Sequence, residues 1–232
     1  MKEYFRRYAV DTANLYNYLD ALNNTCTRCN LGPCIPVTHR GNLNADIMLI
    51  GEGLGKVEEE QRTCFVGPAG QLLDKMFNNI GLDTNTDMLL SNCLMARPKA
   101  PEDSNKQNLT PTEEQLDACF PYVRNLIRIV KPKVIIACGR IALGELLNDR
   151  KVKLKEYEGK WIEYKANYDL VSPNEKETFN IQFNIPMFVM CHPSYILHQT
   201  NYMDKNEFTE LKNKVKNYLN EFKIKYNQLK GK

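Results

Sequence analysis

Three side chains with different chemistry lie at or near the ends of separate apolar runs of the sequence: Glu52, Asn92 and His192. The runs are 47–50, 88–94 and 186–191. Runs of this length are typical of buried strands in a parallel sheet, and such sheets bind ligands outside the carboxyl ends of their strands. The sequence therefore predicts that a carboxylate, an amide and an imidazole from separate loops meet in one ligand site.

Glycines surround the carboxylate of this set. Gly51, Gly53 and Gly55 alternate with other residues, and glycine permits tight turns and a close approach of the backbone to a ligand. Dinucleotide-binding turns share this pattern, but they require a helix that begins at the glycines. Here the acidic run 56–63 follows, and helical periodicity resumes only near Gln71. We therefore expect no nucleotide cofactor.

The elements that must position these residues alternate along the chain. Apolar runs predict strands at 46–51, 88–94, 133–139 and 186–191. Helical patterns lie at 10–25, 68–80, 112–130, 140–149 and 211–222. Residues 150–185 are expected to form a hairpin or an irregular excursion. This alternation predicts an α/β fold, with a central four-stranded, mainly parallel sheet and helices on both faces.

Composition limits the class of protein. A chain of 232 residues with 43% hydrophobic residues can build one sizeable core, so we expect a single domain over 1–232. Its N-terminal segment 1–45 carries cysteines, and its C-terminal helix 206–226 is basic. We expect a monomer with no membrane partner and a cytoplasmic location, because the sequence shows neither a membrane-spanning run nor a signal peptide. The net charge of +3 does not by itself indicate a nucleic-acid partner.

Cysteine is abundant for a chain without a secretory signal. Eight cysteines in this context favour thiols that serve as core residues or metal ligands over disulfides. Cys26 and Cys29 form a C-x-x-C pair, and Cys34 follows in a Gly-Pro loop. Cys138 and Cys191 lie at the ends of apolar strands and are expected to be small core residues.

Several motifs together resemble those of the iron–sulfur uracil-DNA glycosylases, the family 4 type of the uracil-DNA glycosylase superfamily. The matching motifs, in the same order over roughly residues 20–200, are Cys26-x-x-Cys29, Ile50-Gly51-Glu52-Gly53-x-Gly55-x-x-Glu58, Phe65-Val66-Gly67-x-Ala69-Gly70, Asn92 with Arg97-Pro98, Gln107-Asn108-x-x-Pro111, Cys119-x-Pro121-Tyr122, Lys131-Pro132-Lys133 and His192-Pro193-Ser194. The resemblance implies a three-layer α/β/α fold, DNA as the partner and excision of a base from it.

The resemblance also implies roles for the residues of the predicted site. Such an enzyme flips the nucleotide into a pocket and stabilises the negative charge that develops on the departing base. Phe65 is expected to stack on the base, Asn92 to read its Watson–Crick edge, and His192 to donate to a carbonyl oxygen of the base. The alternatives are a core aromatic residue, a turn asparagine and a structural histidine.

Four further residues are expected to line the site. Glu52 and Asn108 match family positions that lie in the active site, where they could orient the attacking water. Gly53 is expected to bring its backbone against the base. Glu58 could line the space where a C5 substituent of the base would point. Its alternative is a solvated acidic run.

Contact with the DNA duplex is expected from the segment after the histidine. Ser194, Tyr195 and Ile196 belong to a loop that would press the minor groove, with Tyr195 or Ile196 as the wedge. The basic C-terminal helix could also contact DNA, although a solvated helix face explains its charge as well. Its lysines are Lys212, Lys214, Lys216, Lys223 and Lys225.

The cysteines match the family in part. Iron–sulfur clusters are usually held by four thiolates. Three family ligands are matched, by Cys26, Cys29 and Cys119. Ala96 stands where the fourth is expected, so Cys34 is the favoured substitute and Cys93 the alternative. The resemblance therefore implies a 4Fe-4S cluster, with zinc or no metal as alternatives.

Two departures at the pocket leave other functions open. Leu54 and Cys64 stand where the family usually has proline, which leaves room for a different base. The first alternative is therefore a glycosylase for a modified pyrimidine, as in modified viral DNA. The second is a non-catalytic DNA-binding or processivity subunit, although intact Glu52, Asn92 and His192 argue against it.

Overall fold

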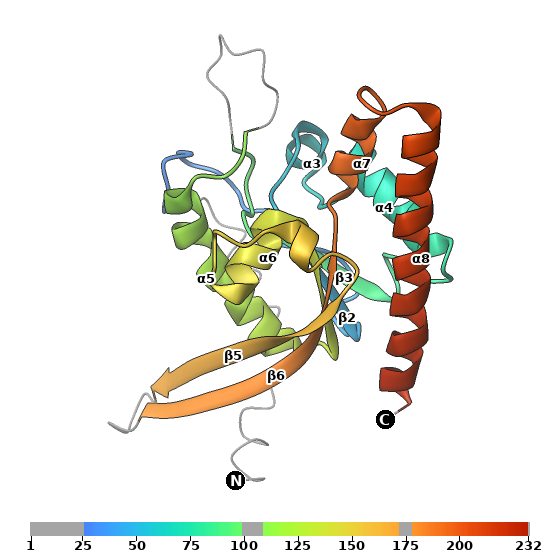
Figure 1. The fold of residues 1–232 in the computed structure, drawn as a ribbon. Helices are drawn as coiled ribbons and strands as arrows, with labels where there is room; N and C mark the ends of the chain where they lie inside the picture. Colours follow the sequence, from blue (N-terminus) through green and yellow to red (C-terminus); the bar gives the residue numbers. More distant parts are fainter. Residues whose placement is uncertain (1–25, 99–108, 172–177, 232) are drawn as a thin grey trace.

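The computed structural model describes residues 26–98, 109–171 and 178–231 (Figure 1). The helix expected at 10–25 lies outside these residues. The strands are β1 (Arg40–Gly41), β2 (Ile47–Gly51), β3 (Met88–Asn92), β4 (Val134–Cys138), β5 (Trp161–Val171) and β6 (Thr178–Met190). The helices are α3 (Lys56–Gln61), α4 (Pro68–Asn78), α5 (Glu113–Val130), α6 (Arg140–Leu147), the 3₁₀ helix η1 (Leu154–Glu156), α7 (Pro193–Gln199) and α8 (Lys205–Lys230).

The strands form one sheet in the order β1-β3-β2-β4-β6-β5. The four central strands β3, β2, β4 and β6 pair in parallel, as their apolar sequences predict. β1 and β5 add antiparallel strands at the two edges, so the sheet has six strands rather than the predicted four. β1 is only two residues long, which is too short to leave a pattern in the sequence.

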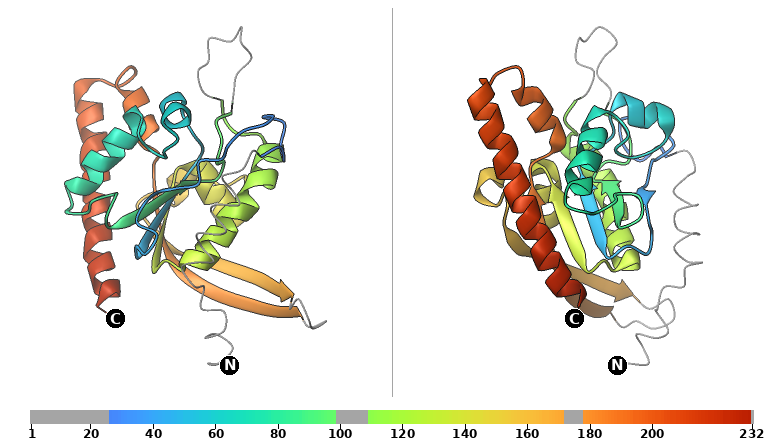
Figure 2. Two further views of the ribbon diagram at one scale, coloured as in Figure 1. Left: turned by 180° about the vertical axis from the view of Figure 1, so that it is seen from behind. Right: turned by 90° about the vertical axis from the view of Figure 1, so that its right-hand side faces the viewer.

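Helices cover both faces of the sheet, because successive residues of each central strand face opposite layers. Met48 and Ile50 belong to a buried cluster with α5 and α6, whereas Ile47 and Leu49 belong to a second cluster with α4, α7 and α8. Figure 2 shows α8 on one side of the sheet and α5 on the other. The three-layer α/β/α architecture is therefore confirmed.

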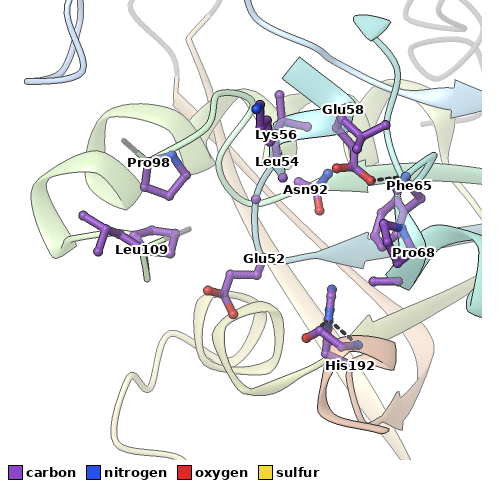
Figure 3. A pocket seen from close by; sticks show the side chains of 17 residues that line it. Glu52, Leu54, Lys56, Glu58, Phe65, Pro68, Asn92, Pro98, Leu109 and His192 are labelled. Carbon is purple, nitrogen blue, oxygen red and sulfur yellow. Dashed lines mark hydrogen bonds between the residues drawn. The ribbon is translucent and has the colours of Figure 1, made fainter. Parts of the chain in front are cut away.

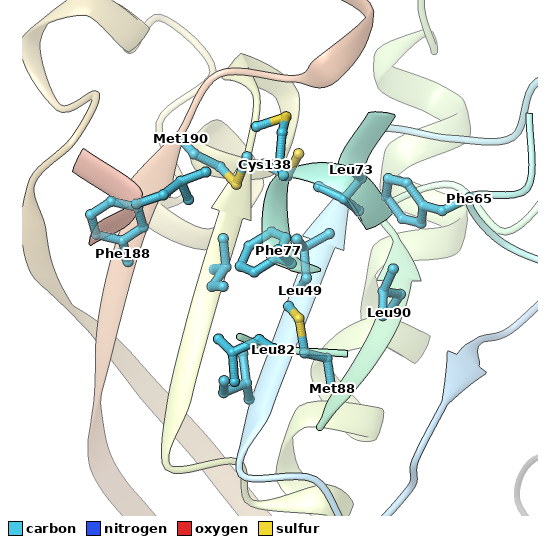
Figure 4. Close-up of a cluster of buried hydrophobic side chains, with 14 of the residues drawn as sticks. Leu49, Phe65, Leu73, Phe77, Leu82, Met88, Leu90, Cys138, Phe188 and Met190 are labelled. Atoms are coloured by element: carbon cyan, nitrogen blue, oxygen red, sulfur yellow. The ribbon is translucent and has the colours of Figure 1, made fainter. Parts of the chain in front are cut away.

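The second cluster lies between one face of the sheet and the helices α4, α7 and α8. In Figure 4, Leu73 and Phe77 of α4 pack over Leu49 and Leu90 of the strands, and Phe65 lies at the edge of the same cluster. This packing fixes α4 on the sheet. It therefore also fixes the segment that leads into α4.

Local signals in the sequence set the ends of α5. Thr112 Oγ1 accepts a hydrogen bond from the Gln115 N–H at 3.3 Å, and Gln115 Oε1 accepts one from the Thr112 N–H at 3.0 Å. This reciprocal capping box is the one that the Thr112 and Gln115 spacing predicts. Lys131, in the left-handed conformation, ends the helix before Pro132.

Of the two forms expected for residues 150–185, a hairpin or an irregular excursion, the structure shows a long hairpin, in which β5 and β6 pair from Trp161 opposite Phe188 to Val171 opposite Thr178. The pair extends well beyond the central strands (Figure 1). α8 is longer than the predicted 211–222, because a capping box at Asp204 starts it earlier. α3 and α7 were not predicted at all.

α3 corrects one argument made from the sequence. It begins directly after Gly55, where the absence of a helix was the reason for excluding a dinucleotide-binding turn. The helix has no apolar stripe to reveal it, because the residue that it buries is Glu58. Among the described residues, no helix is both long and apolar enough to cross a membrane.

Candidate active site

A cavity of about 390 Å³ opens at the carboxyl ends of the central strands (Figure 3). Its lining comes from the segments after β2, β3 and β6, from α3, and from the start of α4. Lining residues include Glu52, Gly53, Leu54, Lys56, Glu58, Phe65, Gly67, Pro68, Asn92, Pro98, Leu109, Pro111, His192 and Ser194. The structure therefore brings together Glu52, Asn92 and His192 from three separate loops.

The pairing of β2 with β3 sets the relative positions of Glu52 and Asn92 at the end of the sheet. Gly51 of β2 pairs with Asn92 of β3, and the pairing continues past the strands with a 3.0 Å bond from the Leu94 N–H to the Glu52 carbonyl. A Cβ atom on Gly51 would lie 2.5 Å from Asn92 Oδ1 and 2.5 Å from the Phe65 ring. Glycine is therefore required at this position to let the amide and the ring approach the strand.

Phe65 and Asn92 are both almost fully buried at the cavity wall, with 5% and 2% of their surfaces exposed. The Phe65 ring lies 6.2 Å from the His192 ring, centroid to centroid, at an angle of 33°. Cys64 is fully buried behind them and its thiol faces the Val37 carbonyl at 3.7 Å, so it fills space rather than lining the cavity. The aromatic ring and the amide thus share one side of the cavity.

His192 is held as a neutral donor. Its Nδ1 accepts a hydrogen bond from the Ser194 N–H at 3.3 Å and lies 2.7 Å from Ser194 Oγ. A ring nitrogen that accepts from a backbone N–H carries no proton, so the proton of the neutral ring is on Nε2. Burial lowers the pKa of His192 to about 4, which keeps the ring neutral near pH 7. Gly139, at φ 96°, leaves room for it, because a Cβ there would lie 3.1 Å from the His192 Cβ.

Glu52 supplies the carboxylate of the cavity. Burial raises the pKa of Glu52 above its usual range, and the positive charge of Arg140 partly opposes this shift. A carboxylate with a raised pKa is a stronger base than an exposed one. Glu52 can therefore orient a water molecule and accept a proton from it.

Glu58 is not part of a solvated acidic run, which was its alternative interpretation. Only 8% of its surface is exposed, and its Oε1 accepts a hydrogen bond from the Gly67 N–H at 2.7 Å. A Cβ on Gly67 would lie 2.9 Å from the same oxygen. The loop before α4 therefore fixes the carboxylate of α3 at the cavity wall.

The structure corrects one predicted DNA contact and leaves another residue undescribed. Residues 194–197 form part of α7 rather than a loop, because His192 caps this helix and Pro193 occupies its first position. Ile196 is 5% exposed and packs in the core, so of the two residues expected as the wedge Tyr195 is the more accessible. Tyr195 is 43% exposed. Asn108 lies outside the described residues.

Sequence reasoning assigned Ser194 to DNA contact and missed its role as the partner of His192. The His-Pro-Ser spacing is the signal for this role. Because His192 is the N-cap of α7, its side chain can accept a hydrogen bond from the N–H of Ser194, two residues later. Lys56 and Leu109, which also line the cavity, carry no signal of their own in the sequence.

Cys26, Cys29 and Cys34 lie in one segment of the chain. This segment is hydrogen-bonded to α5, the helix that carries Cys119. Cys26 and Cys34 pair across an antiparallel bridge, with N–O distances of 2.6 and 3.0 Å. Arg28 donates to the Tyr122 hydroxyl of α5, and Gln115 Nε2 of α5 donates to Asn30 Oδ1 at 2.9 Å. These bonds hold the segment against the helix that carries Cys119.

The environment of Cys119 shows that the other thiols lie near it. Burial is the main cause that raises the pKa of Cys119 to about 11, a bond from the Met95 N–H opposes the shift, and the other three thiols add to it. These three are Cys26, Cys29 and Cys34. Within the part of the chain that the structure describes, no three Cys, His, Asp or Glu side chains are arranged to hold a single metal ion.

The lysines of α8 mostly engage the protein itself. Lys214 forms a 2.7 Å ion pair with Glu158, and Lys223 donates to the Gly81 carbonyl at 3.1 Å. The ammonium groups of Lys212 and Lys225 lie over aromatic rings at 4.8 and 4.9 Å. These contacts favour the structural explanation for the charge of the helix over DNA binding.

Comparison with known proteins agrees with this architecture. The model of the family described as the uracil DNA glycosylase superfamily matches residues 38–216. A type-4 uracil-DNA glycosylase of Pyrobaculum aerophilum is 35% identical over 147 residues, which are 61% of this chain and 71% of that protein. A type-4 uracil-DNA glycosylase of Thermotoga maritima is 31% identical over 174 residues, 74% of this chain and 78% of that protein.

A third relative is matched over a larger share of its own length. The type-4 uracil-DNA glycosylase of Archaeoglobus fulgidus is 30% identical over 177 residues, which are 68% of this chain and 85% of that protein. The residues that the family model matches, 38–216, contain the whole cavity and the central sheet. The chain therefore belongs to the uracil-DNA glycosylase superfamily and aligns within it with the type-4 enzymes.

Proposed function

We propose that this protein is a DNA glycosylase that flips uracil out of DNA and hydrolyses its N-glycosidic bond, leaving an abasic site. The observation that carries the proposal is the buried Asn92 amide beside the Phe65 ring, with the neutral His192 in the same cavity. An aromatic face, an amide and a neutral donor are what binding and releasing a planar pyrimidine require. The relatives named as uracil-DNA glycosylases support the same substrate.

Recognition of uracil rests on the amide of Asn92. Uracil presents a carbonyl acceptor at O4 beside an N–H donor at N3, and one amide carries the complementary donor and acceptor. Cytosine presents the reverse pattern, which the amide can match only after it rotates by 180°. Because unpaired buried polar groups are costly, the site discriminates between the two bases when the orientation of the Asn92 amide is held fixed.

Catalysis divides between the two sides of the cleaved bond. The His192 Nε2–H donates to the carbonyl oxygen of uracil where negative charge develops as the bond breaks. Glu52 orients the attacking water and accepts its proton. A neutral imidazole can give this hydrogen bond without holding a charge in a buried site before the reaction begins.

Selection against C5 substituents falls to Glu58. Its carboxylate is fixed by the Gly67 N–H at the cavity wall, and Leu54 lines the same cavity. A methyl group at C5 of the base would point at this carboxylate and displace water from it. Removing water from a charged group is costly, so the substituent is disfavoured. This arrangement favours unsubstituted uracil over the modified pyrimidine that was the first alternative.

We further propose that Cys26, Cys29, Cys34 and Cys119 hold a 4Fe-4S cluster. Four thiolates are the usual donor set for such a cluster, and each binds a different iron, so they lie farther apart than the ligands of one ion. Cys34 supports the role of fourth ligand through its pairing with Cys26. Cys93, the alternative, is fully buried among the apolar side chains of the core. When bound, the cluster would supply a rigid cross-link between the cysteine segment and α5.

The partner in this proposal is DNA, with the exposed Tyr195 of α7 as the contact in the minor groove. The protein acts as an intracellular monomer without a nucleotide cofactor. Affinity for DNA is expected to weaken as salt increases, because phosphate contacts release counterions.

The test uses matched oligonucleotides that contain uracil, 5-hydroxymethyluracil or glucosylated hydroxymethylcytosine, followed by alkaline cleavage of abasic sites. We expect cleavage at uracil that His192→Ala and Asn92→Ala each reduce by roughly 100-fold or more. Cleavage at only a modified base would replace the proposal with the modified-pyrimidine enzyme. Retained DNA binding with no cleavage at any base would replace it with a non-catalytic DNA-binding subunit.

A further inference from the structure

A nearly buried guanidinium lies beneath the aromatic residue of the site. Arg40 of β1 has 11% of its side chain exposed. Its Nη2 bonds Asp74 Oδ1 of α4 at 2.5 Å and Thr84 Oγ1 at 2.9 Å. Thr84 in turn donates to Asp74 Oδ1 at 2.6 Å, which closes the network. A charge this buried is stable only when it is paired and hydrogen-bonded. Both Nη atoms have such partners, whereas the buried Nε has none among the described residues.

The other arm of the guanidinium reaches the site. Arg40 Nη1 donates to the backbone carbonyl of Phe65 at 2.9 Å. Phe65 has φ 55°, the left-handed region that an aromatic residue rarely adopts. Such a conformation costs free energy and persists only where the surroundings impose it. A Cβ on Gly70 would overlap the Phe65 carbonyl, so the start of α4 confines this group from a second direction.

The conformation of this one residue decides where its ring lies. The ring contacts Gly51 closely and lies 6.2 Å from the His192 ring. If the Phe65 backbone relaxed to a common conformation, the carbonyl and the side chain would rotate together. The aromatic face would then leave the wall that it shares with Asn92.

We propose that Arg40 is a positioning residue for Phe65: together with Asp74 and Thr84, it holds the Phe65 carbonyl so that the ring is presented to the flipped base. The inference rests on the proposed function and deepens the same site. Arg40 does not line the cavity, so it acts on the base only through Phe65.

The test compares Arg40→Met, which keeps the length of the side chain and removes its donors, with the unaltered protein. Single-turnover release of uracil is expected to fall roughly 10- to 100-fold, because a small misplacement of a contact group has this effect. Binding to DNA that contains a non-cleavable 2′-fluoro uracil nucleotide should weaken relative to binding to thymine DNA. Arg40→Lys retains a cation with fewer directed donors and should restore part of the rate.

A double-mutant cycle separates positioning from general stability. In a Phe65→Ala background the ring is gone, so Arg40→Met should change the rate by less than about twofold. An equal loss in both backgrounds would overturn the inference. Arg150→Met is the matched control, because Arg150 forms comparable 2.6 Å bonds to Glu145 and Asp117 outside the cavity lining. It should lower thermal stability and leave the rate unchanged.

Two further outcomes are distinguishable. If Arg40→Met does not fold, Asp74→Asn takes its place in the same cycle, since it weakens the pair and keeps an acceptor. If the unaltered protein releases no uracil, the proposed function fails, and the binding preference for 2′-fluoro uracil DNA alone decides the role of Arg40. An active protein with an unchanged Arg40→Met rate would overturn the inference and leave the proposed function intact.

Discussion

Glu52 and His192 bring two ionisable groups into one cavity, and burial shifts them in opposite directions. The pKa of Glu52 is raised, whereas that of His192 is lowered to about 4. Burial disfavours the charged form of each group, which is an anion in one case and a cation in the other. Over most of the acidic range, therefore, Glu52 is the group whose charge changes while His192 stays neutral.

This difference predicts the pH dependence of the reaction. Glu52 must be ionised to accept a proton, so kcat/KM should fall as the pH drops through its raised pKa, above the usual range of a glutamate. The measurement is a pH profile of uracil release. Glu52→Gln should lose most of the activity and the acidic limb of the profile. A limb that survives in Glu52→Gln would assign it to another group.

A second prediction concerns the wall of the cavity. A Cβ at Gly67 would lie 2.9 Å from Glu58 Oε1, so Gly67→Ala should displace the carboxylate. We expect the rate at 5-substituted uracils to rise several-fold relative to plain uracil. Gly231→Ala is the control, because Gly231 lies outside the cavity lining and a Cβ there meets nothing closer than 3.8 Å. Equal selectivity in the two variants would show that Glu58 does not guard this wall.

At the scale of the elements, α5 connects two parts of the proposed machinery. Its capping residue Gln115 also bonds Asn30 in the cysteine segment, and Cys119 lies one turn further along the helix. The cap therefore stabilises the helix and fastens the segment at once. Removing each partner of the capping box separates these two effects.

Thr112→Ala should remove the bond that Oγ1 accepts and lower the free energy of unfolding by about 1 kcal/mol. Gln115→Ala keeps that bond, because the backbone N–H donates it, but removes the side-chain bonds to the Thr112 N–H and to Asn30, and should cost at least as much. Urea unfolding measures both values. If the cysteines hold a cluster, only Gln115→Ala should also speed the loss of its visible absorbance. Equal behaviour of the two variants would mean that the bond to Asn30 contributes nothing.

The elements that the sequence predicts are those with a repeating apolar pattern. The four central strands and the helices α4, α5 and α6 follow from such patterns, and they place Glu52, Asn92 and His192 together. α3 and α7 have six and seven residues, too few for a periodicity; α3 has no side-chain cap, and the cap of α7 is a histidine rather than one of the usual capping residues. The Arg40 network joins β1, α4 and the turn near Thr84, so only the folded chain shows it.

At the scale of the whole molecule, buried histidines couple stability to pH. The pKa of His192 falls from an ordinary 6.5 to about 4 on folding, and burial also lowers that of His39. Between these two values His192 is more fully protonated in the unfolded chain than in the folded one. The contribution of His192 to stability is therefore complete above about pH 6.5 and is lost as the pH falls toward 4.

Thermal unfolding across this range tests the coupling. The melting temperature should fall as the pH is lowered from 6.5 to 4, and His192→Gln should flatten part of that slope. The buried Glu52 acts in the opposite direction, because its raised pKa favours the folded state at low pH. The difference between the variant and the unaltered protein isolates the histidine. Parallel curves for the two proteins would contradict the assignment.

The pairing of Gly51 with Asn92 limits how the gene for this protein can change. Side chains alternate between the two faces of a strand, so a shift by one residue exchanges all of them. Deleting one codon within β3 would place Cys93 where Asn92 stands and turn the amide toward the opposite layer. Substitution of one apolar residue of β3 by another should therefore be tolerated during evolution. An insertion or deletion within β3 should not, because it would move Asn92 away from the base.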